Sequence, residues 1–323
     1  MDAPYASSTV GRVSETRHSR SRRPKRLLVG VFVLIGLFGY FTAQRDSNGG
    51  GGAPYCTARA TQNGDGFEMT PEQAGNAATI AAVGVAKGLP DRAVTIALAT
   101  AMQESSLRNL DHGDRDSLGL FQQRPSMGWG TADQIMDPVY SAGIFYDRLA
   151  EIPGYSRLPL TVAAQRVQRS GFPQAYAKHE PDATVLTAAF SGDTGRVTCG
   201  GPAPAQAGDP AKVREQLTRI FGKGSMHDSP AAGAAGHRAG EAEVTMVEKR
   251  DGGEPALRRS RMMARWAVAN ARDLNIARVS YGWEGWVAGQ ARGEWQDKGG
   301  PGKSGDGDPH NAMPGTIRIF MAR

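Results

Sequence analysis

Small and apolar residues recur at helical spacing through the first part of the chain. The sequence Thr70-Pro71-Glu-Gln73 is typical of a helix N-terminus, because the Thr70 hydroxyl can cap the helix and the Gln73 amide can close a capping box. This helix is expected to continue to Ala86. Further helices are predicted over residues 91–107, 138–150 and 160–169, where apolar residues recur three and four positions apart.

The pattern changes in the last third of the chain. Residues 201–255 are rich in Gly, Ala and Pro and poor in aromatic residues, which predicts a largely disordered linker with one short amphipathic helix at residues 210–221. A helix over residues 256–273 is expected to bury one apolar face. Alternating apolar positions predict strands over residues 277–281 and 315–321.

These patterns divide the 323 residues into a large helical domain and a smaller mixed one. The expected fold class is a mainly α domain, preceded by one transmembrane helix and followed by a linker and a small α+β module. The predicted segments are a basic cytoplasmic segment (1–26), a transmembrane signal anchor (27–43), a Gly-rich linker (44–54), the helical domain (55–200), the second linker (201–255) and the small module (256–323).

An uncharged apolar run, LLVGVFVLIGLFGYFTA, occupies residues 27–43. It is close to the lower limit of roughly 17–25 residues for a spanning helix. Residues 1–26 hold seven Lys or Arg and two acidic residues, so they carry five of the six net positive charges. This distribution predicts a single-pass protein of the cell membrane with a cytoplasmic N-terminus and extracellular domains. The alternative is a cleaved signal peptide, although Phe41 does not suit its cleavage site.

The same charge distribution argues against a nucleic-acid partner. Outside residues 1–26 the chain is nearly neutral, whereas nucleic-acid binding requires a basic surface on the folded domain. The partner that the basic segment indicates is the membrane.

The chain has two cysteines, Cys56 and Cys199, and both lie on the side predicted to be extracellular. In an oxidising compartment, cysteines at the two ends of one domain are expected to form a disulfide, although two free thiols are the alternative. No Cys-x-x-Cys or His-rich spacing predicts a metal site.

Glu104 is the strongest candidate for chemistry. On the predicted helix 91–107 it shares a face with Ala97, Thr100 and Ala101, small residues that allow another element to approach closely. Partial desolvation and the negative end of the helix dipole both favour the protonated carboxyl, which a general acid requires. The simpler interpretation is a solvent-facing glutamate near a helix end.

Glu104-Ser105, followed by Ser117-Leu-Gly-Leu-Phe-Gln-Gln123, resembles the lytic transglycosylase and goose-type lysozyme group. That family pattern has Glu-Ser at a helix end and then Gly-Leu-Met-Gln on a loop, and here Phe121 replaces the Met. The resemblance covers about residues 70–179 and implies a lysozyme-like domain with Glu104 as its catalytic residue. The residues that it implies for substrate binding are Ser105, Ser117, Gly119, Leu120, Phe121, Gln122, Gln123 and Tyr146.

The resemblance implies cleavage of peptidoglycan glycan strands without a cofactor. Glu104 would protonate the oxygen between N-acetylmuramic acid and N-acetylglucosamine and then accept a proton from the sugar's own 6-hydroxyl, which gives a 1,6-anhydro product. A hydrolase would instead need a second carboxylate roughly 5–9.5 Å away. Asp111, Asp114 and Asp116 are the candidates, although Asp-rich loops of this kind also form turns that bond their own backbone.

One departure from the family pattern keeps a second function open. The family carries an Ala-Tyr-Asn-Ala-Gly segment on the floor of its cleft, and the best local counterpart, residues 167–171, lacks the Tyr-Asn pair. The alternative is therefore a non-catalytic cell-envelope protein that binds peptidoglycan or a partner protein. In the small module, Trp283, Trp286 and Trp295 form either its core or a carbohydrate platform.

Overall fold

The computed structural model describes residues 53–170, 174–223, 226–228, 242–248, 253–297 and 316–322. All of them belong to one compact unit, Gly49–Arg323. The predicted cytoplasmic segment 1–26, the predicted anchor 27–43 and most of the linker 44–54 lie outside the described residues. Within the described ranges, no helix is both long and apolar enough to cross a membrane.

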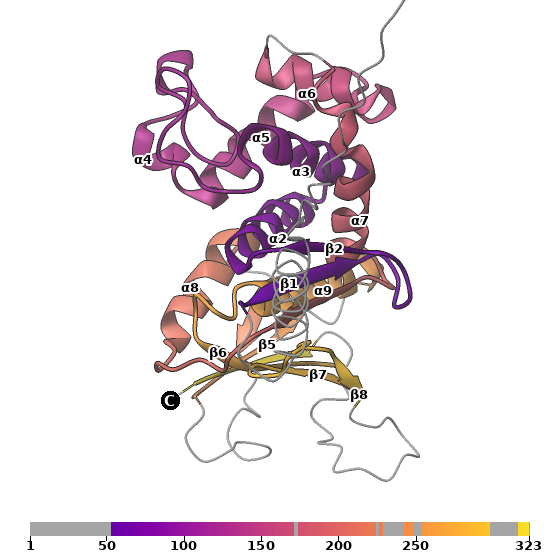
Figure 1. Cartoon of the computed structure of the whole chain (residues 1–323), viewed down its shortest axis with the longest axis vertical. Helices are drawn as coiled ribbons and strands as arrows, with labels where there is room; N and C mark the ends of the chain where they lie inside the picture. The colour runs from indigo at the N-terminus through magenta and orange to yellow at the C-terminus, as the bar shows by residue number, and fades with distance from the viewer. Residues whose placement is uncertain are drawn as a thin grey trace, which may run out of the picture. The chain divides into compact units, whose positions relative to one another are not determined.

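The first part of the unit is built from six α-helices, and Figure 1 shows most of them stacked above the strands. The helices are α2 (Pro71–Ala86), α3 (Asp91–Ser105), α4 (Ala132–Ile135), α5 (Pro138–Ala150), α6 (Leu160–Gln168) and α7 (Glu180–Ser191). Short 3₁₀ turns η1 (Pro125–Met127), η2 (Tyr155–Arg157) and η3 (Ala177–His179) connect them. Helix α3 packs against α2, α5, α6 and α7, so it lies at the centre of this part.

The start of α2 forms as its sequence predicts. The Thr70 side chain accepts the Gln73 backbone N–H, the Gln73 side chain accepts the Thr70 N–H, and Pro71 occupies the first turn. The helix consists largely of alanine and glycine, and it is buried on almost all of its faces. At Gly84 an added Cβ would lie 2.7 Å from the Tyr146 hydroxyl, so the absence of a side chain there allows α5 to pack closely on α2.

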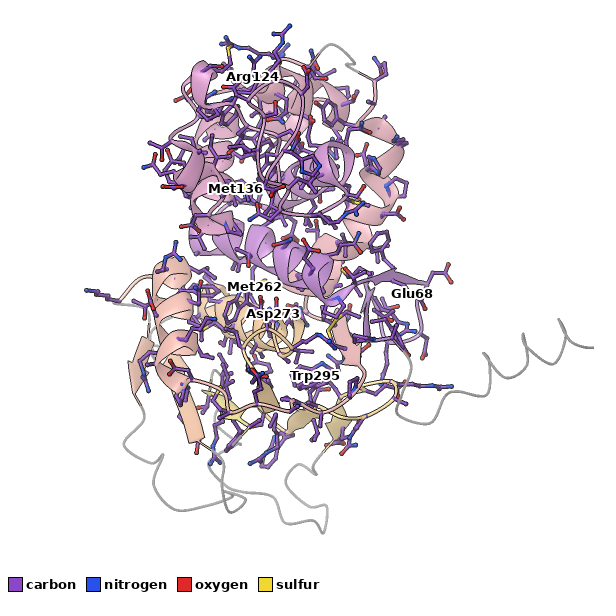
Figure 2. All side chains as sticks on the ribbon, turned by 60° about the vertical axis from the view of Figure 1, so that its left-hand side comes forward. Glu68, Arg124, Met136, Met262, Asp273 and Trp295 are labelled. Carbon is purple, nitrogen blue, oxygen red and sulfur yellow. A yellow bond between two sulfur atoms is a disulfide. The ribbon has the colours of Figure 1, made fainter. Side chains whose placement is uncertain are left out.

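A three-stranded antiparallel sheet joins the two ends of the helical part. Its order is β2 (Gly66–Met69), β1 (Tyr55–Arg59) and β3 (Arg196–Gly200). The register places Cys56 opposite Cys199, and the two form a disulfide, which confirms the predicted pairing. Figure 2 shows this disulfide near the strand that carries Glu68. The bond therefore fastens the first strand of the unit to the strand that follows α7.

The last part of the unit is a six-stranded antiparallel sheet with two helices. The strand order is β4 (Met226–Asp228), β5 (Ala242–Glu248), β9 (Thr316–Met321), β6 (Ile276–Tyr281), β7 (Glu284–Val287) and β8 (Gln296–Asp297). The helices are α8 (Pro210–Phe221) and α9 (Gly253–Ala269). The predicted helix at residues 210–221 and the predicted strands at 277–281 and 315–321 are confirmed to within one residue.

The expectation of a mainly α fold is wrong. The described residues form a mixed α/β structure with eight α-helices and two antiparallel sheets. Strands β4 and β5 lie within residues 201–255, where the sequence predicts a largely disordered linker. The reason is that β5 pairs with β9, about seventy residues further along the chain, so no local signal reveals its partner.

Helix α9 belongs to both parts of the unit. It packs against α2 and α7 on one side and against strands β5, β6 and β9 on the other. Trp266 donates its indole N–H to Thr79 of α2 at 3.3 Å, and the buried Arg265 donates to the carbonyl oxygens of Phe190, Gly192 and Gly195. Burial on two sides explains why α9 is apolar over more than the one face that the sequence indicates.

Two of the three tryptophans predicted to form a core or a carbohydrate platform are packed inside the unit. Trp286 is buried, and the half-buried Trp295 donates its indole N–H to the Val197 carbonyl of β3 at 2.8 Å. These contacts favour the interpretation of Trp286 and Trp295 as packing residues.

Candidate functional site

The end of α3 determines where Glu104 lies. The helix ends at Ser105, and Ser106 and Leu107 both adopt the left-handed conformation, with φ of 54° and 61°. Their backbone N–H groups bond the carbonyl oxygens of Met102 and Ala101, which is the arrangement of a helix C-terminal cap. Glu104 therefore stands in the last turn of a helix whose other faces are buried, and it is itself half-buried.

Two uncharged donors meet the Glu104 carboxyl group. The Tyr176 hydroxyl donates to Glu104 Oε1 at 2.7 Å, and the Gln168 amide donates to the same oxygen at 3.3 Å. Tyr176 is fully buried, and its burial, followed by the negative charge of Glu104, raises the pKa of its phenol well above the usual range. Tyr176 therefore remains a hydrogen-bond donor at neutral pH.

The loop after α3 is attached to the site from two sides. The Ser105 hydroxyl lies 3.0 Å from the Ala101 carbonyl and 2.8 Å from the Leu120 carbonyl, so it connects the helix end to the loop. From α6, the Gln168 amide donates to the Phe121 carbonyl at 2.7 Å. Ser105 and Gln168 thus fix the loop beside Glu104 through its backbone.

The loop itself is a tight turn closed by a bridge between Leu118 and Gln123. Gly119 has φ of 74°, and an added Cβ would lie 2.7 Å from the Ile135 carbonyl. The glycine is therefore required by the turn and by the close approach of α4. Gln122 adopts φ of 47°, a left-handed conformation that is unusual for a residue with a side chain.

Most of the residues that the resemblance implies for substrate binding have buried side chains. Leu120 and Phe121 are fully buried, and Phe121 stacks on Phe145 with ring centroids 4.6 Å apart. Tyr146 is buried and donates to the Ile80 carbonyl at 2.9 Å. Gln123 is buried and donates to the Ser141 carbonyl at 3.1 Å. Phe121 and Gln123 therefore attach the loop to α5, and Tyr146 attaches α5 to α2.

The remaining residues of the predicted set lie nearer the surface or at the start of the loop. Gln122 is half-buried and donates to the carbonyl oxygens of His112 and Gly119, each at 3.3 Å. Ser117 is buried, and its backbone N–H bonds the Asp114 carbonyl at 3.0 Å. Of the predicted set, Ser105 and Gln122 therefore combine a polar side chain with a position at the site.

The three loop aspartates take part in local contacts. Asp111 pairs with His112 at 2.7 Å, and the exposed Asp114 lies 4.0 Å from Arg115 Nε. Asp116 accepts from Arg124 Nε at 2.7 Å and from the Ser126 backbone N–H at 2.9 Å, and the Arg124 hydrogen bond holds the pKa of Asp116 well below its usual range. This pattern is typical of an aspartate-rich turn, as the simpler interpretation of the sequence predicts.

A groove of about 540 Å³ opens beside the site. Gln168 lines this groove and also donates to Glu104, so the groove is linked to the carboxyl group through one residue, while Glu104 itself is not a lining residue. Arginine is its most frequent lining residue. The lining residues are Gln122, Arg124, Met127, Trp129, Arg148, Glu151, Ile152, Arg166, Val167, Gln168 and Arg169.

Two residues of the site were missed by sequence reasoning. Gln168 lies in the segment 167–171, which was the nearest local counterpart of the family's Ala-Tyr-Asn-Ala-Gly, but its contact with Glu104 could not be foreseen. Tyr176 lies in Gln174-Ala-Tyr-Ala177. That segment has the Ala-Tyr order of the family motif, and this order is the signal that could have identified Tyr176.

Among the described residues, no group of three or more His, Cys, Asp or Glu side chains could hold a metal ion. Comparison with known proteins finds no family model that matches this chain and no curated protein that is significantly similar to it. The site is therefore characterised by its own geometry: a glutamate in the last turn of a buried helix, bonded by a buried tyrosine and adjoining an arginine-lined groove.

Proposed function

We propose that this protein is a cell-wall glycosidase that cleaves the glycan strand of peptidoglycan, with Glu104 as its single general acid and base. The observation that carries the proposal is the 2.7 Å hydrogen bond from the buried Tyr176 to Glu104, which fixes one carboxyl oxygen. A carboxyl group held in this way can present its second oxygen in a constant direction, as proton transfer to a glycosidic oxygen requires.

The contacts of two of the three loop aspartates favour a lytic transglycosylase over a two-carboxylate hydrolase. Asp111 and Asp116 are engaged with His112 and Arg124, and a transglycosylase needs no second carboxylate because the sugar's own 6-hydroxyl is the nucleophile. In this mechanism Glu104 donates a proton to the leaving oxygen and then accepts one from the 6-hydroxyl. No organic cofactor is required.

The proposed location is the outer face of the cell membrane. The basic segment 1–26 and the apolar run 27–43 support a signal anchor with the catalytic part outside. The disulfide between Cys56 and Cys199 agrees with an oxidising compartment. In this arrangement the enzyme acts on wall polymer close to the membrane.

The test is digestion of purified peptidoglycan by the full-length protein in a non-ionic detergent, with the products identified by mass spectrometry. We expect anhydro-muropeptides from the wild type and from Glu215→Gln, which removes the charge of an exposed glutamate on α8. Glu104→Gln is expected to release none. Reducing-end products would instead identify a hydrolase, and digestion by Glu104→Gln at the wild-type rate would refute the role of Glu104.

A second candidate function is a non-catalytic envelope protein that binds glycan strands or a partner protein. The arginine-lined groove favours it, because such a surface can bind a polymer without any chemistry at Glu104. Retention of peptidoglycan strands by the folded wild type, without any released product, would support this candidate.

A further inference from the structure

The groove beside Glu104 carries an excess of positive charge. Its lining includes four arginines, Arg124, Arg148, Arg166 and Arg169, and one carboxylate, Glu151. A glycan made only of neutral sugars gives no reason for such a surface, since sugar hydroxyls are bound by amides, carboxylates and aromatic rings as readily as by guanidinium groups. The composition of the groove therefore points to an anionic ligand.

Two of the arginines are held in place by the protein. The Arg148 guanidinium lies over the Trp129 ring, 3.5 Å from its centroid, and donates to the Gly128 carbonyl at 2.6 Å. Arg124 bonds Asp116, as described above. Their orientation is thus fixed before any ligand arrives, which lowers the entropic cost of binding.

The other two arginines are available to a ligand. Arg166 and Arg169 lie at the C-terminal end of α6 and are exposed. In the described part of the chain neither has a carboxylate partner within ion-pair distance. Arg169 has φ of 51°, a left-handed backbone conformation that is energetically unfavourable for any residue other than glycine.

The arginines also affect one another. Burial first, and then the positive charge of Arg169, lower the pKa of Arg148. Like charges gathered in this way repel, and a bound anion would remove the repulsion.

Gln168 links the groove to Glu104, since it lines the groove and its amide nitrogen donates to the Glu104 carboxyl at 3.3 Å.

We propose that this groove is a subsite for anionic groups, carboxylate or phosphate, carried by the polymer whose glycan strand lies across Glu104. The identity of the strand rests on the proposed function, whereas the anion site rests on the arginines alone. Two sources can supply the anion: the carboxylates of the acidic peptides attached to N-acetylmuramic acid, and the phosphodiesters of a polymer attached to the wall.

The experiment measures binding by the full-length protein carrying Glu104→Gln, so that no strand is cut. Three probes are compared by fluorescence anisotropy in a non-ionic detergent: labelled strands with free peptide carboxylates, the same strands after amidation, and a poly(glycerol phosphate). The variant adds Arg166→Gln and Arg169→Gln. The matched control adds Arg157→Gln and Arg292→Gln, two exposed arginines outside the groove, and so changes the net charge equally.

We expect the groove variant to bind the free-carboxylate strands about tenfold more weakly than the control, because two charge-assisted contacts are removed. Amidation of the strands should weaken binding to the control protein to a similar degree. Arginine-dependent binding of poly(glycerol phosphate) with no preference for free carboxylates also supports the subsite and assigns phosphate as its source. Equal binding of all probes by the groove and control variants overturns the proposal.

Failure of this inference can be distinguished from failure of the proposed function. If the wild type releases no product but strand binding depends on Arg166 and Arg169, the glycosidase proposal fails and the anion subsite remains. If the wild type shows Glu104-dependent cleavage while the groove variant binds every probe as the control does, the subsite is refuted and the glycosidase proposal remains.

Discussion

Two glutamates, Glu104 in the helical part and Glu243 in the sheet, show how differently the two parts use a carboxylate. Glu243 and Arg318 are buried together, with 2% and 6% of their side chains exposed, and form two hydrogen bonds at 2.5 and 3.2 Å. Glu104 is half-buried, and among the described residues its side chain meets the neutral donors Tyr176 and Gln168.

The arginines of the two parts repeat this contrast. Arg318 bonds Glu243 within the six-stranded sheet, Arg196 of β3 bonds Glu284 of β7, and Arg261 of α9 bonds Asp193. In the helical part the groove contains four arginines, of which Arg124 bonds Asp116, whereas Arg166 and Arg169 have no carboxylate partner among the described residues. Charges that are paired inside the fold are used for structure, whereas charges that the fold positions without neutralising them are available to a ligand.

The largest effect is expected from Glu104→Gln. Loss of the general acid and base should reduce the cleavage rate by a factor of about 10²–10⁴, while the melting temperature stays close to that of the wild type because the amide can still accept from Tyr176. Turnover of labelled peptidoglycan and a thermal melt measure the two quantities. A large fall in the melting temperature of Glu104→Gln would show that Glu104, like Glu243, has a structural role.

Glu243→Ala should have the opposite effect: a large loss of stability with no change in activity per folded molecule. It leaves the Arg318 guanidinium buried without its carboxylate, which is expected to lower the free energy of unfolding by about 3–5 kcal/mol. Chemical denaturation measures this change. Because Glu243 lies in the sheet part, the activity per folded molecule should be unchanged, and a specific loss of activity would show that the two parts are coupled.

Tyr176→Phe tests whether the tyrosine positions Glu104. The change keeps the buried ring and removes the hydroxyl that donates to Glu104 at 2.7 Å. We expect kcat to fall about fivefold with a smaller change in KM, since one fixing hydrogen bond is worth about 1 kcal/mol. Tyr140→Phe, a half-buried tyrosine of α5, is the matched control. Equal kinetics of the two variants would contradict the positioning role.

The smallest effect is expected from His179, which bonds Gln103 at 3.2 Å beside the site. Burial first, and then the charge of Lys178, lower the pKa of His179 below its usual value of 6.5. The unfolded chain therefore binds a proton at a higher pH than the folded one, so the stability that His179 contributes is present above pH 6.5 and is lost as the pH falls below it. Thermal melts at pH 7.5 and about 5.5 should differ less for His179→Gln than for the wild type. An equal difference in both proteins would refute this assignment.

Local signals predicted much of the helical part. The capping box at Thr70, the helix at Pro138–Ala150 and the half-buried glutamate at the end of α3 all follow from residues close together in the chain. The disulfide was also predictable, because the chain offers only two cysteines. The sheets were not, since β1 pairs with β3 and β5 pairs with β9 across long separations.

The site divides in the same way. The sequence by itself determined that Glu104 ends a helix of small residues and is followed by a glycine-containing loop, since helix periodicity and turn chemistry are properties of neighbouring residues. Only the tertiary structure decided that Tyr176 and Gln168 reach this glutamate and that arginines from α5, α6 and two loops share one groove. These contacts depend on how α3, α5 and α6 pack, and packing is determined by the whole buried core and not by any one segment.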